Sequence, residues 1–338
     1  KELAKLAFCK TAYYDSLIAN WFLKKNELLG VGQSSVPLKK ERSLRYGENP
    51  HQKASIFSFG KNKISKISGK DLSYNNICDL EIAMELAEQF NKPSCVILKH
   101  GNPCGMSLNN NQVLAYKNAL LCDPISAFGG VIAFNQSLSK STAKEVLKLF
   151  TEVIVAPAFD DDALEILTRK KNLILIQYLS AKEKTLFSIK STRNFLLIQE
   201  KDQLLVSKND IHFKTNKKID HKSLEDMMFG FIVAKYINSN AIVLTKNLST
   251  LGIGIGQTNR LASAKQAIEQ MKKNFSKTDA ILASDGFFPF PDIVRLCSKN
   301  NISGIIQPGG SLNDELVIKE AEKNNIQMVF TGVRHFKH

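Results

Sequence analysis

Long apolar runs and export signals are absent from this 338-residue sequence: it has no uninterrupted apolar stretch of about 18 residues and no secretory signal pattern at its start. There is no case for membrane insertion or export, and we expect a cytoplasmic protein. The six cysteines include no CxxC pair, and a chain this long does not need disulfide staples, so we expect reduced thiols. Because 43% of the residues are hydrophobic, the chain can bury a large core and form more than one folding unit.

The charge balance is strongly one-sided, with a formal net charge of +14 at pH 7. Such an excess of lysine and arginine favours anionic partners, which include nucleic acid, a membrane surface and small molecules. The Lys-rich segment 214–222 lacks the interleaved aromatic residues of a single-strand binder and shows no helix-turn-helix pattern. We therefore expect neither a nucleic-acid nor a membrane partner and interpret the charge as a solvated basic surface, with nucleic-acid binding as the alternative to test.

Helix-like segments alternate with short apolar strands along most of the chain. Residues 79–91 place apolar side chains at helical spacing after Asp79, a candidate helix cap, and 95–98 follow as a buried strand. Ser223 with Asp226 forms a candidate capping box for a helix over 223–237. This alternation predicts an α/β fold with a largely parallel or mixed sheet. The same pattern recurs in 141–150 and 153–156, 161–170 and 173–177, 262–272 and 280–283, 293–300 and 302–307, and 313–324 and 327–331.

A polar, Lys-rich stretch over residues 178–222 interrupts this alternation. Its only strand candidates are 195–198 and 204–206, so we place a subdomain boundary near residue 205. The segments before and after the stretch form two α/β halves of similar rhythm, as an ancient duplication would produce.

Polar and glycine residues gather where the predicted strands end. Apolar strands lead directly into the segments 99–105, 284–290, 308–311 and 332–336. Because ligand sites form at the carboxyl ends of strands in α/β sheets, these segments predict one composite site for an anion. His100 follows a buried strand and neighbours Lys99, a combination suited to proton transfer near neutral pH.

Motifs in a fixed order carry a family resemblance. RYGENPHQ (45–52), LSYNN (72–76), KHGNPCG (99–105) and DPISAFGG (123–130) are followed by the segments 239–241, 252–260, 284–292, 308–314 and 334–338. Together they resemble AICAR transformylase, the formyltransferase region of bifunctional purine-biosynthesis enzymes, over residues 40–338. Residues 1–22 resemble the last helix of the family's N-terminal IMP cyclohydrolase domain, the rest of which is absent from this sequence.

The resemblance implies a fold and a division into domains. It implies duplicated, cytidine-deaminase-like three-layer α/β/α subdomains within one chain. The expected segments are 1–22 as the end of the cyclohydrolase domain with a linker, 23–205 as the first transformylase subdomain and 206–338 as the second.

The resemblance also implies a reaction in purine biosynthesis. The family transfers a formyl group from 10-formyltetrahydrofolate to the 5-amino group of AICAR, giving FAICAR and tetrahydrofolate on the way to IMP. That amine is a weak nucleophile, so its proton must be removed as it attacks, and the tetrahedral oxyanion must be stabilised. By resemblance, His100 accepts the proton, Lys99 is the cationic stabiliser or proton donor, and Asn240 orients the formyl group and the carboxamide.

Binding residues are carried over in the same way. Arg45, Tyr46 and His51 belong to a segment that crosses to the neighbouring subunit in similar proteins, which implies a homodimer with shared active sites. A potassium ion near Asp285 is a further feature of some relatives. Core packing is the alternative role for Phe288 and Phe290. The AICAR residues are Arg45, Tyr46, His51, Asn76, Gly129, Glu152, Phe287, Arg334 and His338, and the folate residues are Ile125, Asn259, Leu261, Phe290 and Asp292.

Two other cofactors fit the sequence poorly. Zinc deaminases need H-x-E with P-C-x-x-C, whereas here Ser107 stands where the second cysteine would be and no His-x-Glu occurs. The glycine run 252–256 is not followed by a ribose-binding acid at the usual distance, so we expect no nicotinamide cofactor. A hydrolytic deaminase remains the alternative enzyme class to test.

Overall fold

The structure, a computed structural model, describes residues 1–23, 31–58, 64–179, 187–276 and 278–338. Its contacts divide the chain into two compact units, which we describe separately. The first unit consists of Lys1–Ile64 with Leu179–Leu204, and the second unit of Ser65–Tyr178 with Leu205–His338. The expected boundary between residues 22 and 23 adjoins residues 24–30, which lie outside the described residues.

The first unit contains a long helix and two hairpins among its described residues. The helix, α1 (Glu2–Phe22), has many exposed apolar side chains, among them Trp21. The strand expected at 195–198 is present within one hairpin, whereas residues 204–206 form no strand. The antiparallel pairs are β1 (Lys39–Ser43) with β2 (Ser55–Ser58) and β9 (Phe187–Ser191) with β10 (Leu196–Glu200).

The second unit is built on a mixed sheet of 12 strands. The prediction of an α/β fold with a mixed sheet is therefore confirmed. In sheet order the strands are β11 (His212–Phe213), β16 (Gln327–Phe330), β15 (Ile302–Gln307), β14 (Ala280–Ser284), β12 (Ile242–Lys246), β13 (Ser249–Gly254), β5 (Asn102–Leu108), β4 (Ser94–Lys99), β6 (Val131–Phe134), β7 (Val153–Ala156), β8 (Ile174–Tyr178) and β3 (Ile64–Ser68).

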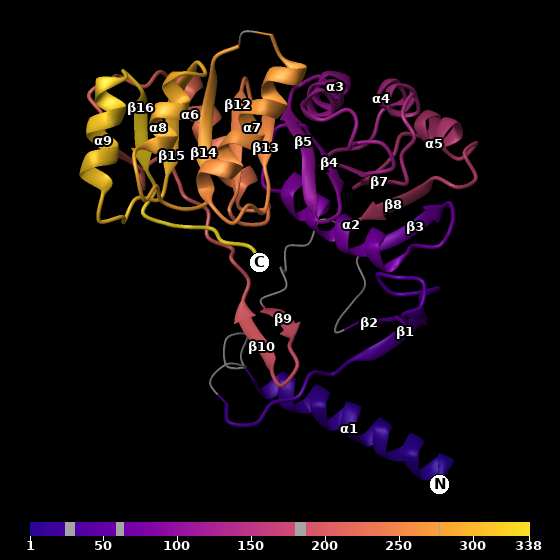
Figure 1. Ribbon diagram of the computed structural model, residues 1–338. Helices are drawn as coiled ribbons and strands as arrows, with labels where there is room; N and C mark the ends of the chain where they lie inside the picture. The colour runs from indigo at the N-terminus through magenta and orange to yellow at the C-terminus, as the bar shows by residue number, and fades with distance from the viewer. Residues whose placement is uncertain (24–30, 59–63, 180–186, 277) are drawn as a thin grey trace. The chain divides into compact units, whose positions relative to one another are not determined.

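This sheet consists of two halves with the same order of elements (Figure 1). In the first half, α2 precedes the β4–β5 hairpin, and α3, α4 and α5 alternate with β6, β7 and β8; in the second half, α6 precedes the β12–β13 hairpin, and α7, α8 and α9 alternate with β14, β15 and β16. The halves meet where β5 pairs with β13, and the hydroxyl groups of Ser107 and Ser249 lie 2.7 Å apart there. The helices are α2 (Tyr74–Ala87), α3 (Gln112–Cys122), α4 (Lys140–Val146), α5 (Asp161–Leu167), α6 (His221–Ala234), α7 (Arg260–Asn274), α8 (Asp292–Ser298) and α9 (Asp314–Lys323).

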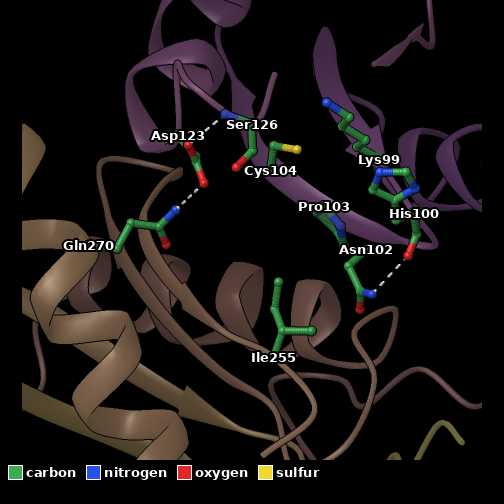
Figure 2. Close-up of a pocket in the computed structure, with 9 residues that line it drawn as sticks. All are labelled: Lys99, His100, Asn102, Pro103, Cys104, Asp123, Ser126, Ile255 and Gln270. Carbon is green, nitrogen blue, oxygen red and sulfur yellow. Dashed lines mark hydrogen bonds between the residues drawn. The ribbon is translucent and has the colours of Figure 1, made fainter. Parts of the chain in front are cut away.

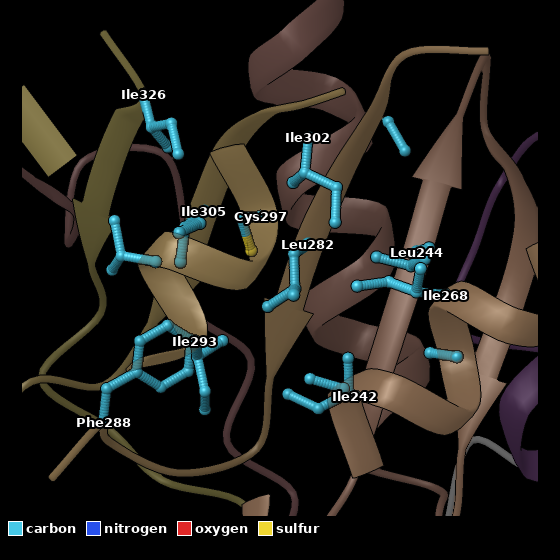
Figure 3. Packing of buried hydrophobic residues seen from close by; sticks show 14 of the residues in the cluster. Ile242, Leu244, Ile268, Leu282, Phe288, Ile293, Cys297, Ile302, Ile305 and Ile326 are labelled. Carbon is cyan, nitrogen blue, oxygen red and sulfur yellow. The ribbon is translucent and has the colours of Figure 1, made fainter. Parts of the chain in front are cut away.

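Helices cover both faces of the sheet, which is why its central strands are almost continuously apolar. In the second half, alternate strand residues such as Ile242, Leu282 and Ile305 pack with α7, α8 and α9 in one cluster (Figure 3). The intervening strand residues face α6, where Gly230 lies directly against Ala283. The sheet therefore has a hydrophobic core on each face. The polar side chains of the predicted site lie near the ends of its strands.

A glycine at the same place in each half lets a helix approach the central strands closely. A Cβ atom on Gly105 of β5 would lie 2.0 Å from the carbonyl oxygen of Ala119 in α3. The corresponding atom on Gly252 of β13 would lie 2.1 Å from the carbonyl oxygen of Ala267 in α7. Any side chain at either position would therefore force the helix away from the sheet.

Two predicted helix starts are wrong, for a shared reason. α2 begins before Asp79, and its cap is Ser73, whose side chain accepts a hydrogen bond from the Asn76 backbone in a capping box. α6 is capped by Asp220 rather than by a box of Ser223 with Asp226. Asp79 and Asp226 each lie inside a helix, where they bind the backbone of a distant hairpin turn. A cap pattern in the sequence does not distinguish these two uses of an acidic side chain.

Candidate active site

One edge of the 12-stranded sheet collects nearly all the predicted site residues of the second unit. The strand pairings place the carboxyl ends of β4, β13, β14, β15 and β16 at this edge, together with the amino ends of β5, β6, β7, β8 and β12. The polar segments that follow β4, β14, β15 and β16 therefore open at the same edge, as a composite site requires. Asn240, Gly129 and Glu152 precede strands that start at this edge.

The turn between β4 and β5 places His100 at this edge. We predicted a loop over 99–105, but β4 extends to Lys99 and β5 starts at Asn102, so the turn itself is only His100 and Gly101. Both turn residues have positive φ, 52° and 75°, which two-residue hairpins of this class require. The carboxylate of Asp79 accepts the N–H of His100 at 3.1 Å and that of Gly101 at 2.7 Å. Asp79 of α2 thus holds the backbone of the turn, and the imidazole of His100 is exposed.

A pocket of about 290 Å³ lies beside this turn, between the two halves of the sheet (Figure 2). Lys99 and His100 line it from the first half, and Ile255 and Gln270 line it from the second. A hydrogen bond of 3.0 Å from Gln270 to Asp123 joins the halves at one end. The remaining lining residues are Asn102, Pro103, Cys104, Asp123 and Ser126.

Cys104 supplies a sulfur atom to this pocket but not a nucleophile. Burial raises the pKa of its thiol to about 12, so the thiol stays protonated near neutral pH. The other titratable side chains in the pocket wall are Lys99, His100 and Asp123, and the Asp123 carboxylate accepts hydrogen bonds from Ser126 and Gln270.

Lys99 connects the pocket to the loop that precedes β6. Its ammonium group donates to the carbonyl oxygen of Phe128 at 2.7 Å. The next residue, Gly129, has a φ of 74° and donates its N–H to the carbonyl of Phe150 at 2.8 Å. Lys99 and Gly129 are thus neighbours in space, as their predicted roles in one site would need.

Asn76 and Glu152 are a second predicted pair that the fold brings into contact. The side-chain amide of Asn76 donates to Glu152 at 2.9 Å, and Lys70 lies 3.5 Å from the other carboxylate oxygen. Asn76 is buried in the first turn of α2, and its backbone N–H and side chain both belong to the cap with Ser73. The amide is therefore fixed in orientation, and the Glu152 carboxylate beside it remains partly accessible.

Asn240 is held rigidly by a buried ion pair that our sequence analysis did not assign. Its side-chain oxygen accepts a hydrogen bond of 2.7 Å from Arg260, and its side-chain N–H donates to the carbonyl of Gln257 at 2.8 Å. Arg260 is itself buried and paired with Asp285, which also accepts from Ser239 at 2.5 Å. Arg260 lies at the end of the quoted motif 252–260, but its partners are 20 or more residues away, and no local pattern identifies them.

Asp285 fits a potassium ion poorly. Its two carboxylate oxygens are engaged by Arg260 and by the hydroxyl of Ser239. The guanidinium already neutralises the buried carboxylate, so a second cation on the same group would meet repulsion. The contacts of Asp285 therefore give no support to potassium on this carboxylate.

The C-terminal segment closes over this ion pair. The backbone N–H of His335 donates to the carbonyl of Asp285 at 3.0 Å, and the ring of Phe336 packs against Arg260. Arg334 lies over the same ring, 4.7 Å from its centroid, and the ring of His338 lies 5.9 Å away on centroids. Arg334 and His338 are exposed, so both can reach a ligand.

The predicted folate residues are placed more loosely. Ile125 and Phe290 are 86% and 59% exposed, which leaves both accessible to an apolar ligand. Phe287, which was predicted for the AICAR site, is 37% exposed. Asn259 caps α7, and Leu261 packs against the core of the second half. Asp292 starts α8. Phe288 is fully buried in the same core, so the packing role weighed for it is the observed one.

Arg45, Tyr46 and His51 belong to the first unit rather than to the unit that holds the pocket. Within that unit, Arg45 donates to the Tyr46 hydroxyl at 3.0 Å and lies over the Tyr46 ring. Both side chains offer polar groups, but the pocket of the second unit is built without them.

Residues 1–23, 31–58, 64–179, 187–276 and 278–338 contain neither a cluster of metal ligands nor a membrane-spanning helix. Within these ranges, His, Cys, Asp and Glu side chains nowhere gather in groups of three or more that could hold a metal ion. Across the described chain, no helix is both long enough and apolar enough to cross a bilayer.

Comparison with known proteins decides the family. A family model described as the AICARFT/IMPCHase bienzyme matches residues 1–270. This chain belongs to that family. Proteins named "Bifunctional purine biosynthesis protein PurH" are similar to it over 99 to 100% of its length: the protein of Thermoanaerobacter sp. (strain X514) is 43% identical, that of Caldicellulosiruptor saccharolyticus 44% and that of Buchnera aphidicola subsp. Schizaphis graminum 46%.

The chain spans about two thirds of the length of these relatives. It covers 66% of the Thermoanaerobacter protein, 67% of the Caldicellulosiruptor protein and 68% of the Buchnera protein. The family resemblance inferred from the motifs is confirmed by these matches.

Proposed function

We propose that this chain transfers a formyl group from 10-formyltetrahydrofolate to the 5-amino group of AICAR, giving FAICAR and tetrahydrofolate. The observation that carries the proposal is the pairing of Lys99 and His100 in the wall of a pocket between the halves, at the sheet edge that also holds Asn240. Membership of the AICARFT/IMPCHase family supports the substrates.

The chemistry needs a base, an oxyanion stabiliser and an orienting group. The amine nitrogen attacks the formyl carbon, and His100 takes the amine proton as the new C–N bond forms. Lys99 stabilises the negative charge on the formyl oxygen. The bond to N10 of the folate then breaks, and the proton passes to N10, so that tetrahydrofolate leaves neutral at that nitrogen. Asn240, whose amide is fixed by Arg260, orients the formyl group and the carboxamide.

The remaining predicted residues contact either AICAR or the folate. Arg334 grips the AICAR phosphate, since a guanidinium offers two parallel donors to an oxyanion. Asn76, Gly129 and Glu152 contact the base and ribose, and Phe287 and His338 line the nucleotide site. The pterin lies against Ile125, Asn259, Leu261, Phe290 and Asp292. The whole protein is a cytoplasmic, bifunctional enzyme whose other activity is IMP cyclohydrolase.

The fold assignment is proposed on similar grounds. The repeated order of elements in the two halves supports a duplicated, cytidine-deaminase-like three-layer subdomain. We propose 1–22 as the end of the cyclohydrolase domain, 23–205 as the first transformylase subdomain and 206–338 as the second.

A single spectrophotometric assay tests the reaction against its alternatives. We expect loss of 10-formyltetrahydrofolate only when AICAR is present, unchanged by a chelator. Metal-dependent release of ammonia would instead identify a deaminase. A nucleic-acid-binding protein would show neither, and its affinity for single or double strands would fall steeply with salt.

Homodimerisation with shared sites is the second part of the proposal. If Arg45, Tyr46 and His51 reach the partner subunit's pocket, a phosphate contact is supplied in trans and activity requires association. The interface should then fall in the obligate class of roughly 2,000 Å² or more.

Complementation tests this arrangement. Arg45→Ala and His100→Ala subunits, each inactive alone, should form heterodimers with one intact site and up to half the wild-type specific activity when coexpressed. Heterodimers verified by two different tags that stay as inactive as their parents would place Arg45 and His100 in one chain's site.

A further inference from the structure

Lys337 links the two polar segments to which the proposed catalytic residues belong. Its ammonium group donates to the carbonyl oxygen of Gly101 at 3.0 Å and to that of Tyr236 at 2.9 Å. Its backbone is tied to Ser239, which donates its N–H to the Lys337 carbonyl at 2.9 Å and accepts the Lys337 N–H on its hydroxyl at 3.2 Å. One residue thus bonds the neighbour of His100 with its side chain and the neighbour of Asn240 with its backbone.

The Gly101 peptide is held between opposite charges. Asp79 accepts the N–H groups of His100 and Gly101, and Lys337 binds the Gly101 carbonyl. Asp79 and Glu85 of α2 also attract the ammonium group, although burial is the larger influence and lowers the pKa of Lys337 to about 8. The N–H groups of His100 and Gly101 and the carbonyl group of Gly101 are therefore all bonded. These bonds fix a turn in which both residues have positive φ.

In the equivalent turn of the second half, the described residues show no lysine bonded to the carbonyl of the second turn residue. There the carbonyl of Leu248, which corresponds to Gly101, accepts the backbone N–H of Leu108 at 2.9 Å. Asp226 replaces Asp79 in the matching position of α6. A hairpin of this kind is therefore complete without a lysine, and Lys337 is an addition specific to the turn that carries His100.

We propose that Lys337 is a positioning residue for formyl transfer, whose side chain fixes the His100 turn relative to the segment of Asn240. It does not touch the reacting atoms. It sets the geometry of the base against the group that orients the acceptor, and misplacement by about 1 Å can cost roughly a hundredfold in rate. This inference rests on the proposed function.

The test compares Lys337→Met, Lys337→Arg and a control, Lys222→Met, which removes an exposed lysine of α6. Hydrogen exchange of the His100 and Gly101 amides, followed by mass spectrometry, should accelerate about tenfold in Lys337→Met, because one charge-assisted hydrogen bond is lost. Exchange at Asn247 and Leu248 should stay unchanged and so report intact folding. The turnover number should fall about 10- to 100-fold with the AICAR KM within about twofold. Lys337→Arg should recover part of both losses, and Lys222→Met should match wild type.

Each other result counts against part of the argument. Unchanged exchange at His100 and Gly101 overturns the positioning role, as does faster exchange with a wild-type turnover number. A rise in the AICAR KM alone would make Lys337 a nucleotide contact and also overturn it. A wild-type protein without AICAR-dependent loss of formyl donor refutes the proposed function instead, and the exchange rates still decide whether Lys337 fixes the turn.

Discussion

The β4–β5 and β12–β13 hairpins turn in the same way at opposite edges of the sheet. Each has two turn residues with positive φ, His100 and Gly101 in one, Asn247 and Leu248 in the other. In each, an aspartate at the sixth position of the preceding helix accepts both turn N–H groups. Positive φ costs a residue other than glycine roughly 1–2 kcal/mol, so these bonds offset a real strain in both halves.

What surrounds the turns differs. Lys99 and His100 face a pocket, and the C-terminal segment reaches the turn through Lys337. In the second half, Lys246 before the turn is paired with Asp279, and Leu248 is bonded to the other hairpin. The same turn therefore faces the candidate pocket at one edge and joins the two halves at the other. The two halves thus share the turn conformation and differ in the side chains that it carries.

The largest expected difference between the two turns is in the effect of exchanging His100 and Asn247 on the turnover number. His100→Asn installs the residue of the other turn, which tolerates positive φ, and should lower the turnover number about 10²- to 10⁴-fold while AICAR still binds, because only the proton acceptor is lost. The reverse change, Asn247→His, should leave turnover unaltered. Steady-state kinetics with AICAR binding by calorimetry provide the check. A wild-type turnover number in His100→Asn would remove the imidazole from the mechanism.

Substitution of Asp79 or Asp226 should lower stability in both cases but lower activity only at Asp79. Asp79→Asn and Asp226→Asn each weaken a carboxylate bond to a turn N–H, worth about 2 kcal/mol in urea unfolding. The loss should be smaller for Asp226, because burial raises the pKa of this carboxyl and the neutral amide relieves that penalty. Turnover should fall, about tenfold or more, only in Asp79→Asn. Equal effects on turnover from both variants would mean that the second turn also governs the site.

Local patterns in the sequence found the alternation of helices and strands and the cluster of polar strand ends, because both depend on residues close in the chain. They missed β5 over Asn102–Leu108, which begins within the polar segment 99–105. Gly105 of this strand is needed for the approach of α3, and the strand is completed by pairing with β13. Motif resemblance named Lys99, His100 and Asn240, but the groups that hold them are remote in sequence. Lys337, for example, is 236 residues from Gly101.

The smallest effect should appear in the pH dependence of stability, and it again contrasts the two turns. Burial lowers the pKa of Lys337 from 10.5 to about 8 in the folded chain, whereas the backbone N–H of Leu108 under the other turn does not titrate. Below about pH 8 both states carry the proton, and the fold bears the full penalty of the buried ammonium. Between about pH 8 and 10.5 the unfolded chain binds more protons, so this contribution to stability rises with pH and then levels off.

The unfolding free energy of wild type minus that of Lys337→Met should therefore increase over this window by the order of 1 kcal/mol, since partial exposure reduces the full effect. Tyrosines and cysteines titrate alike in both proteins and cancel. Urea unfolding at several pH values measures the difference, and a decrease over the same window would mean that Asp79 and Glu85 outweigh burial and hold the ammonium charged.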